Sequence, residues 1–417
     1  MATQPQLEPL GIGTLTRYLT GQHEAIVAVA SSRSALWVGL LFVLSAGFAR
    51  EYDGEDLLHE PWHLLIPLAA STATSLILFV LTFAKVAWRS SERPTFLAAY
   101  RSFLGLYWMT APLAWLYAIP YERFMSAPDA IRANLWTLAI VALWRVVLMI
   151  RVLRVVMGYG AVTSVINVVA FGVAVAFGVA AIIPRPIVGL MGGIRLTESE
   201  QLIADVTFLI QAASLLASPV LLLAWLSALF AAKPLWNARV GILQTSTTWP
   251  LRGLVVLAIL GWAAVLPSTQ SEQLLRRRVE RDLRDGRIAA ALALMGEHEP
   301  GDFPPHWDPP PFPGYGKRRN NPDILDVMEQ IADQPPAAWV RAVYLEKFDQ
   351  YLSGMFHASG PEEPAVDRVL NLLSRLPEGP ALATKYYQER NYHPRRFSPN
   401  EDARLKEITG APTPEGE

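Results

Sequence analysis

Long apolar blocks between residues 34 and 267 are the feature that most restricts how this chain can fold. Pro, Trp and Arg separate the blocks, and several blocks hold the roughly 20 residues that a helix needs to cross a bilayer core. Inside that core the backbone has to bond to itself, which a helix does. We therefore expect an all-α fold, in which a polytopic membrane bundle of about seven transmembrane helices precedes a small helical soluble domain.

The seven expected spans differ in length and in the residues that interrupt them. The first has only about sixteen residues, so it has to borrow flanking residues or tilt little. The third contains Pro112, which predicts a kink. The fifth carries Ala170, Ala174 and Gly178 at four-residue spacing, which predicts a packing face against a neighbouring helix. The expected spans are residues 34–49, 62–83, 96–119, 133–150, 161–183, 201–232 and 249–266.

The segment before the first span, residues 1–33, is a polar lead-in that contains one short helical pattern at 24–32. We expect this helix to lie at the membrane surface. The N-terminus lacks a basic region followed by an apolar core, so we do not expect a cleaved signal peptide. The chain has no cysteine, which excludes disulfides, thiolate metal sites and cysteine nucleophiles.

Orientation follows from Lys and Arg in the loops, which concentrate on the cytoplasmic side of a membrane protein. An N-terminus in the cytoplasm places about twice as many of them inside as outside. Seven spans then carry the C-terminal domain across, and we expect a bacterial inner membrane. An Arg-rich run at 276–287 argues the other way, because such a cluster normally stays in the cytoplasm. Either this run belongs to a folded domain that crosses regardless, or the span count is off by one.

The C-terminal part reads as helices separated by Pro and Gly. Residues 268–396 predict a helical soluble domain, in which the patterns at 272–296, 323–332, 336–352, 363–376 and 380–389 are the helices. A Pro-rich connector at 300–313 favours polyproline II, with Trp307 and Phe312 packed on the helices beside it. No fixed repeat period is evident in this part. We expect residues 397–417 to be disordered.

The motif His59-Glu60-Pro61-Trp62-His63 matches H-E-x-x-H, in which two histidines on one helical face bind zinc and the glutamate acts as a base. An acidic turn precedes it, and Asp53, Glu55 or Asp56 could supply a third ligand to zinc or another divalent cation. Pro61 argues against the site, because a helix interior does not tolerate it. If the helix begins near Glu60, His59 is a cap. The alternative is a solvated acidic connector with Pro61 starting the second span.

Charged groups are rare inside the expected spans. No Asp, Glu or His lies deep within one, which disfavours a proton-coupled pump or transporter. Arg101 and Arg145 lie closer to span ends than to centres, so we expect their side chains to extend toward the headgroups. Polar residues such as Ser71, Asn167 and Gln211 could line a cavity or bond helix to helix.

Three functions remain open at this point. The first is a non-enzymatic membrane or envelope component that acts through the lipid bilayer and through protein contacts of residues 268–396. The second is a membrane-embedded metal-dependent hydrolase that uses the H-E-x-x-H motif. The third is a small-solute transporter or channel. The net charge of −1 gives no basic face for nucleic acid, so no nucleic-acid partner is expected.

Overall fold

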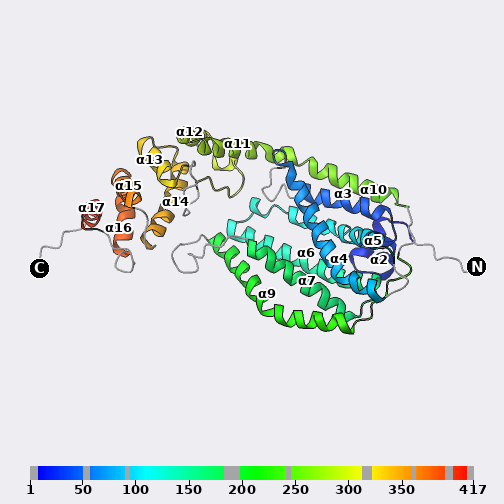
Figure 1. Cartoon of the computed structure of the whole chain (residues 1–417). Helices are drawn as coiled ribbons and strands as arrows, with labels where there is room; N and C mark the ends of the chain where they lie inside the picture. Colours follow the sequence, from blue (N-terminus) through cyan, green and yellow to red (C-terminus); the bar gives the residue numbers. More distant parts are fainter. Residues whose placement is uncertain are drawn as a thin grey trace, which may run out of the picture. The chain divides into compact units, whose positions relative to one another are not determined.

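The computed structural model describes residues 8–49, 57–89, 94–182, 198–240, 246–311, 322–357, 363–389 and 398–410. Within these ranges the chain is helical and has no β-strand, and an isolated bridge joins Leu10 to Thr247. The all-α class is therefore confirmed. The chain divides into two compact units (Figure 1), one reaching Ser268 and the other continuing from Thr269, with the start of the helix at Glu198 grouped with the second.

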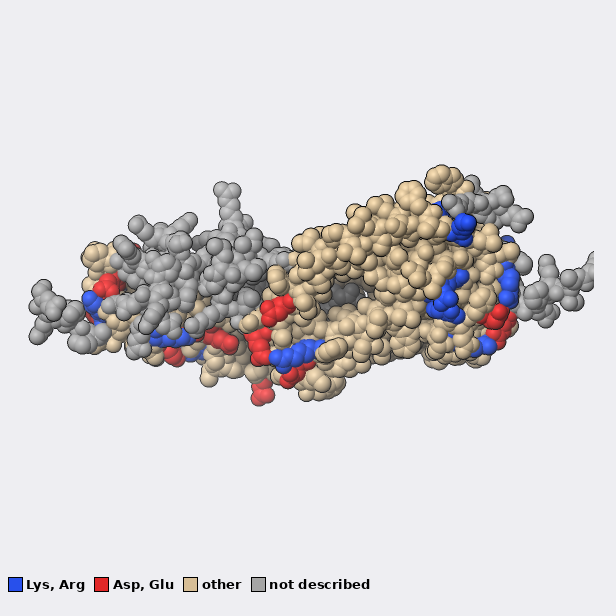
Figure 2. All heavy atoms as spheres, turned by 90° about the horizontal axis from the view of Figure 1, so that it is seen from below, with Lys and Arg blue, Asp and Glu red and all other residues tan. Residues whose placement is uncertain are grey.

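The first unit is a bundle with an apolar exterior. Its elements are α1 (Ile12–Leu19), α2 (His23–Ala30), α3 (Ser34–Ala49), η2 (Pro61–Leu64), α4 (Leu65–Arg89), α5 (Phe96–Trp108), η3 (Ala111–Ala118), η4 (Tyr121–Arg123), α6 (Ala127–Val156), α7 (Ala161–Ile182), α9 (Glu198–Ala231) and α10 (Trp249–Ala263). Large apolar side chains such as Leu143, Leu216 and Phe230 face outward. Figure 2 shows a broad face of this unit that is nearly free of charge. A surface of this kind suits lipid rather than water.

Five helical stretches in the described part of the chain are long and apolar enough to cross a membrane. They are Pro61–Trp88, Phe96–Arg123, Ala161–Val179, Gln201–Ala231 and Trp249–Arg284. Helix α3 is apolar but has only 16 residues, and α6 has 30 residues that include Arg145, Arg151 and Arg154. The membrane character of the chain is thus supported, while the count of seven spans stays a prediction.

The short helix α2, which was predicted to lie at the membrane surface, packs into the bundle, and its position relative to the membrane stays a prediction. Residues 25–30 are all buried, and α2 packs against α1, α5 and α6. Its sequence explains this position, because Ala25, Ile26, Val27, Val29 and Ala30 cover every side of the helix. A helix that is apolar all round is expected to be buried.

The third expected span is broken. Helix α5 ends at Trp108, and the chain continues as the 3-10 helix η3, in which Pro112 occupies one of the first two positions. The break falls at Met109 and Thr110, because Pro112 has no N–H to donate to the carbonyl of Trp108, four residues earlier, and its ring clashes with that carbonyl. The hydroxyl of Thr110 donates to the carbonyl of Tyr107 at 2.7 Å, which satisfies a backbone group at the break.

Glycines allow a close contact between α3 and α5. A Cβ added to Gly39 would lie 2.7 Å from the Cβ of Trp108, and Gly105 of α5 faces Ala35 of α3. The small-residue stripe predicted on the fifth span does not make such a contact, since a Cβ added to Gly178 would meet no described atom within 4 Å. Close approach between helices therefore depends on glycines that lie outside the predicted stripe.

The second unit contains its own hydrophobic core. Its elements are α11 (Leu266–Arg284), whose first residues belong to the first unit, α12 (Ile288–Gly296), η5 (Pro300–Asp302), α13 (Ile324–Asp333), α14 (Ala338–His357), α15 (Glu363–Arg375), α16 (Gly379–Glu389) and α17 (Pro399–Thr409). The helical pattern at 272–296 is interrupted at Gly286, whose φ of 77° favours glycine. Within the tail that was predicted to be disordered, residues 399–409 form α17, which is capped by Ser398 and Glu401 and buries Leu405, while residues 411–417 lie outside the described residues.

Helices α12 to α17 form a two-layered array. One layer stacks α12, α14 and α16, and the other stacks α13, α15 and α17. Packing between the layers joins α12 to α13, α13 to α14, α15 to α16 and α16 to α17. Ion pairs join the second layer: Arg368 of α15 lies 2.8 Å from Glu329 of α13, and Arg404 of α17 lies 2.8 Å from Asp367 of α15. This is the packing of helical-pair repeats.

Equivalent buried positions in the array recur at a constant interval. The same number of residues separates Tyr344 from Tyr386, Ile331 from Leu373, and Val327 from Val369, and all six are buried. The interval falls within the roughly 40–47 residues of HEAT-type repeats. The tyrosine pair and the valine pair are each identical, whereas Ile331 corresponds to Leu373.

The Pro-rich connector is not a continuous polyproline II segment. It begins with the 3-10 helix η5, and His306 has a φ of 56°. Trp307 packs against the core of the second unit, as its sequence suggested, and stacks on Phe303 with ring centroids 4.7 Å apart. Phe312 lies outside the described residues. The connector is therefore a packed part of the second unit as far as it is described.

Candidate functional site

The H-E-x-x-H motif lies where the second apolar helix begins. Pro61 starts η2, Glu60 is its N-cap, and His59 precedes the helix in a turn. This start explains how Pro61 is tolerated, because the first helical residue needs no backbone donor. The Nε2 atom of His63 lies 3.6 Å from Oε2 of Glu60. Glu60, the predicted base, thus contacts His63, which is one of the two predicted histidine ligands.

The predicted third ligands Asp53, Glu55 and Asp56 lie outside the described residues. In the part of the chain that is described, no three His, Asp or Glu side chains gather in a way that could hold a metal ion. The zinc site of His59, Glu60 and His63 remains a prediction. Metal analysis of the purified protein and of a His59→Ala/His63→Ala variant would test it.

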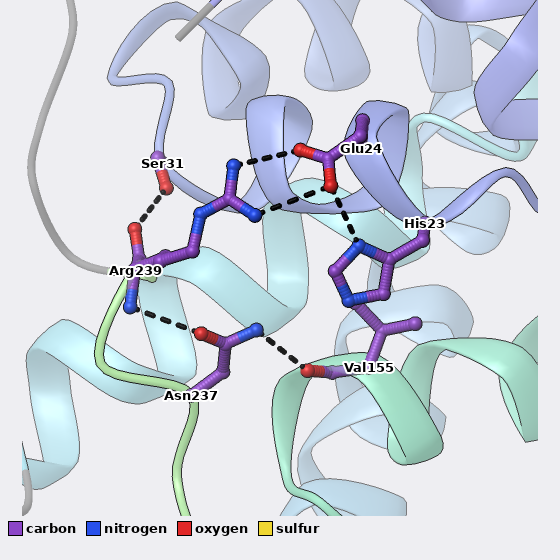
Figure 3. A network of polar contacts seen from close by, with 6 residues as sticks. All are labelled: His23, Glu24, Ser31, Val155, Asn237 and Arg239. Carbon is purple, nitrogen blue, oxygen red and sulfur yellow. Dashed lines mark hydrogen bonds and ion pairs between the residues drawn. The ribbon is translucent and has the colours of Figure 1, made fainter. Parts of the chain in front are cut away.

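A cluster of polar contacts holds α2 to the segment between α9 and α10 (Figure 3). Arg239 reaches both carboxylate oxygens of Glu24 at 3.2 and 2.7 Å, and Ser31 donates to the carbonyl of Arg239 at 3.0 Å. Asn237 accepts from the backbone N–H of Arg239 and donates to the carbonyl of Val155 at 3.0 Å. Hydrogen bonds from Arg239 and His23 lower the pKa of Glu24. The cluster fastens the N-terminal helices to the rest of the bundle.

The hydroxyl residues of the second expected span bond to α5. The hydroxyls of Thr74 and Tyr107 are 3.2 Å apart, Ser75 and Tyr100 are 3.3 Å apart, and the indole N–H of Trp108 donates to Ser71 at 3.1 Å. Asn167 of α7 donates to the carbonyl of Thr163, within its own helix. These contacts agree with helix-to-helix and local bonding, the simpler of the two interpretations of these polar residues.

Arg145 points into the bundle, although its sequence position suggested a side chain that extends toward the headgroups. Its Nε donates to the hydroxyl of Thr110 at 3.1 Å, and its guanidinium carbon lies 5.2 Å from the ring centroid of Tyr107. Both contacts depend on the break between α5 and η3. An arginine inside a transmembrane bundle is by default a candidate functional residue.

Tyr18 of α1 lies near this arginine. Its side chain is fully buried, and its hydroxyl donates to the carbonyl of Leu106 at 2.6 Å. Burial raises the pKa of Tyr18, and the nearby charge of Arg145 offsets only part of that effect. Tyr18 therefore stays neutral at any ordinary pH and provides no negative charge to balance Arg145.

We name this group, Arg145 with Thr110, Tyr107 and Tyr18, the Arg145 cluster. Sequence reasoning identified Arg145 but not its neighbours. The available signal was the run Tyr107-Trp-Met-Thr-Ala-Pro112, in which polar and aromatic residues immediately precede a helix-breaking proline.

Comparisons with protein-family models, with curated proteins and with solved structures give no match for this chain. Its class rests on its own features: the described residues form an all-helical chain, and five of its helical stretches are apolar and long enough to cross a membrane.

Proposed function

We propose that this protein is a membrane-anchored docking protein, in which the bundle holds the helical array at a membrane and the array binds an extended segment of another membrane or envelope protein. The observation that carries the proposal is the two-layered array of α12 to α17, which already holds the Pro-rich connector against α14. Stacked helical pairs form extended surfaces of the kind that bind peptides and proteins. The step from architecture to function is an analogy between folds.

The segment that lies against α14 is residues 303–311 of the Pro-rich connector. Tyr344 of α14 donates its hydroxyl to the carbonyl of Pro310 at 2.9 Å, and the buried Lys347 of the same helix lies 2.5 Å from a carboxylate oxygen of Asp308. The ring of Phe303 lies 5.7 Å from that of Trp339. The α14 side of the array thus accepts a chain that offers proline, an aromatic ring and a carboxylate.

The two layers of the array differ in what remains free for a partner. On the layer of α13, α15 and α17, ion pairs engage many of the charged side chains, including Arg368, Arg375 and Arg404. On α14 and α16 ion pairs join Lys385 to Asp349 and Arg341 to Glu378, and the exposed positions include Ala342, Glu346 and Ala381. The Pro-rich connector already lies against α14. We therefore place the docking surface on α14 and α16.

The orientation that we propose puts the N-terminus in the cytoplasm and the array on the opposite side of a bacterial inner membrane. Hydrogen bonds bring α1, α2 and the α9–α10 segment to one end of the bundle, and Figure 2 shows Lys and Arg gathered at the end nearest the N-terminus. In the proposed seven-span topology the basic residues on the N-terminal side are Arg17, Arg33, Lys85, Arg151, Arg154, Lys233, Arg239 and Arg252. This end is the cytoplasmic one by the positive-inside rule.

Seven crossings by α3, α4, α5 with η3, α6, α7, α9 and α10 then take the chain to the other side. The Arg-rich run at 276–287 is compatible with this crossing, because two of its arginines, Arg276 and Arg287, pair with carboxylates of the same unit. Arg287 lies 2.6 Å from Asp282 and 2.9 Å from Asp285, and Arg276 lies 3.7 Å from Glu280. The hydrogen bond to Asp282 raises the pKa of Arg287.

Site-specific photo-crosslinking in intact cells tests the docking proposal. A crosslinking amino acid replaces Glu346 or Ala381 on α14 and α16, and Asn371 or Ser374 on the exposed side of α15 serves as the matched control. We expect discrete adducts from the first pair only, joined to a Pro-containing extended segment of one partner. Equal adducts from both pairs, or none from either, would contradict the proposed docking surface.

A further inference from the structure

We propose that the Arg145 cluster binds the phosphate group of an anionic membrane lipid. The inference does not depend on the docking function, because the cluster lies wholly in the first unit. It rests on the unmet hydrogen-bonding capacity of the guanidinium, on the neutral character of its neighbours, and on the position of the cluster along α6.

The guanidinium of Arg145 offers five N–H donors and remains charged at any ordinary pH. One of them, Nε–H, donates to Thr110, while no described residue accepts from the two terminal nitrogens. No carboxylate among the described residues lies within ion-pairing distance of it. The terminal nitrogens form the planar fork that matches two oxygens of one phosphate.

The neighbours of Arg145 orient it without neutralising it. Thr110 holds Nε, the ring of Tyr107 lies beneath the guanidinium at 5.2 Å, and Tyr18 is a neutral phenol. A positive charge in an apolar bundle is unfavourable unless an anion accompanies it. Since the described protein groups supply only dipoles and a ring, the missing partner is an anion from outside the chain.

The position of the cluster favours a lipid as the source of that anion. Trp144, the adjacent residue of α6, is 41% exposed and donates its indole N–H to the carbonyl of Leu19 at 2.8 Å. Arg151, two turns further along, donates to the carbonyl of Gly21 at 3.2 Å. The cluster therefore lies in the half of α6 beside α1 and the basic end. An exposed tryptophan there marks the level of the lipid headgroups.

Free phosphate shares this chemistry, so the test separates the two sources. The full-length protein is purified in a neutral detergent, and its thermal unfolding midpoint is measured by tryptophan fluorescence. The additions are phosphatidylglycerol, phosphatidylcholine and inorganic phosphate. Arg145→Gln removes the fork, and Arg154→Gln removes an exposed charge from the same helix as the matched control. Native mass spectrometry counts the lipid molecules that remain bound.

We expect phosphatidylglycerol to raise the midpoint by several degrees more than phosphatidylcholine in the wild type and in Arg154→Gln, but not in Arg145→Gln. One phosphatidylglycerol should remain bound in the first two proteins and be lost from the third. A shift from inorganic phosphate that also requires Arg145 would assign the site to a free anion and overturn the lipid. A phosphatidylglycerol effect that survives Arg145→Gln, or that is absent from the wild type, would overturn the site.

Two further variants keep the test decisive if Arg145→Gln does not fold. Arg145→Lys keeps the charge but removes the fork, and Thr110→Val releases Nε from its partner. Each should bind phosphatidylglycerol more weakly than the wild type. Unchanged retention of the lipid by both variants would contradict the proposal.

Discussion

Glu24 and Arg239 lie 215 positions apart in the sequence, yet Oε2 of Glu24 is 2.7 Å from Nη2 of Arg239. The pair joins the second helix of the chain to the segment that follows α9. The loop that carries Arg239 is therefore held against the N-terminal helices by side chains as well as by backbone contacts such as Leu10 to Ser246.

Removing Asn237 should destabilise the bundle more than removing its neighbour Arg239. Asn237 makes two hydrogen bonds to backbone groups, so Asn237→Ala should lower the free energy of unfolding by about 1–2 kcal/mol. The ion pair of Arg239 is largely exposed, so Arg239→Ala should cost at most about 1 kcal/mol. Unfolding in detergent measures both, and the reverse order would contradict the roles given to the two residues.

The same ion pair predicts a dependence on pH. Arg239 lowers the pKa of Glu24 below its ordinary value of 4.5, so the pair stabilises the folded state above that value and loses its effect as the pH falls through the lowered pKa. The wild type should be slightly more stable than Glu24→Gln at pH 7, and the two should converge in acid. A stability difference that grows as the pH falls would refute this assignment.

Gly39 should tolerate no larger side chain. A leucine there would collide with Trp108, and overpacking of this kind costs about 1–3 kcal/mol. Gly178→Leu is the matched control, since a Cβ there meets no described atom within 4 Å. The unfolding midpoint in detergent should fall for Gly39→Leu and stay nearly constant for the control. Equal effects of the two substitutions would contradict the close packing of α3 against α5 at Gly39.

The array should depend on Arg368 more than on Arg404. Arg368 contacts Asp323, Asp326 and Glu329, and these carboxylates raise its pKa, with Glu329 as the main cause. Its loss leaves three carboxylates close together, so Arg368→Met should increase hydrogen exchange across α13 and α15. Arg404→Met removes a single exposed pair and should change exchange little. Equal protection of α13 in both variants would contradict this role.

Apolar periodicity predicted much of this fold, because the strongest sequence signals are local. The expected span at 34–49 coincides with α3, and the fifth expected span differs from α7 by one residue at its end. Helices α13, α15 and α16 begin and end within a residue or two of their predicted limits. Each has apolar residues at helical spacing between breakers, and so its limits could be predicted without knowledge of any partner.

The features that could not be predicted from the sequence depend on contacts between residues that are far apart in the chain. The burial of α2 and the inward direction of Arg145 arise from packing against α5 and η3, which no local pattern encodes. The sequence analysis found no repeat period in the array, although Val327 and Tyr344 recur as Val369 and Tyr386. The ordered α17 was missed because its polar composition resembles that of a disordered tail, although Ser398 and Glu401 supply a capping box.

The most direct test of the central claim, an anchored array on the far side of the membrane from the N-terminus, is the labelling of single cysteines. The chain has no cysteine of its own, so Gln22→Cys in the α1–α2 turn and Ser374→Cys in α15 each introduce one exposed thiol. We predict that a membrane-impermeant maleimide added to spheroplasts labels Ser374→Cys at once and Gln22→Cys only after the membrane is opened. Labelling of both thiols before the membrane is opened, or of neither, would place the two on the same side and contradict the account.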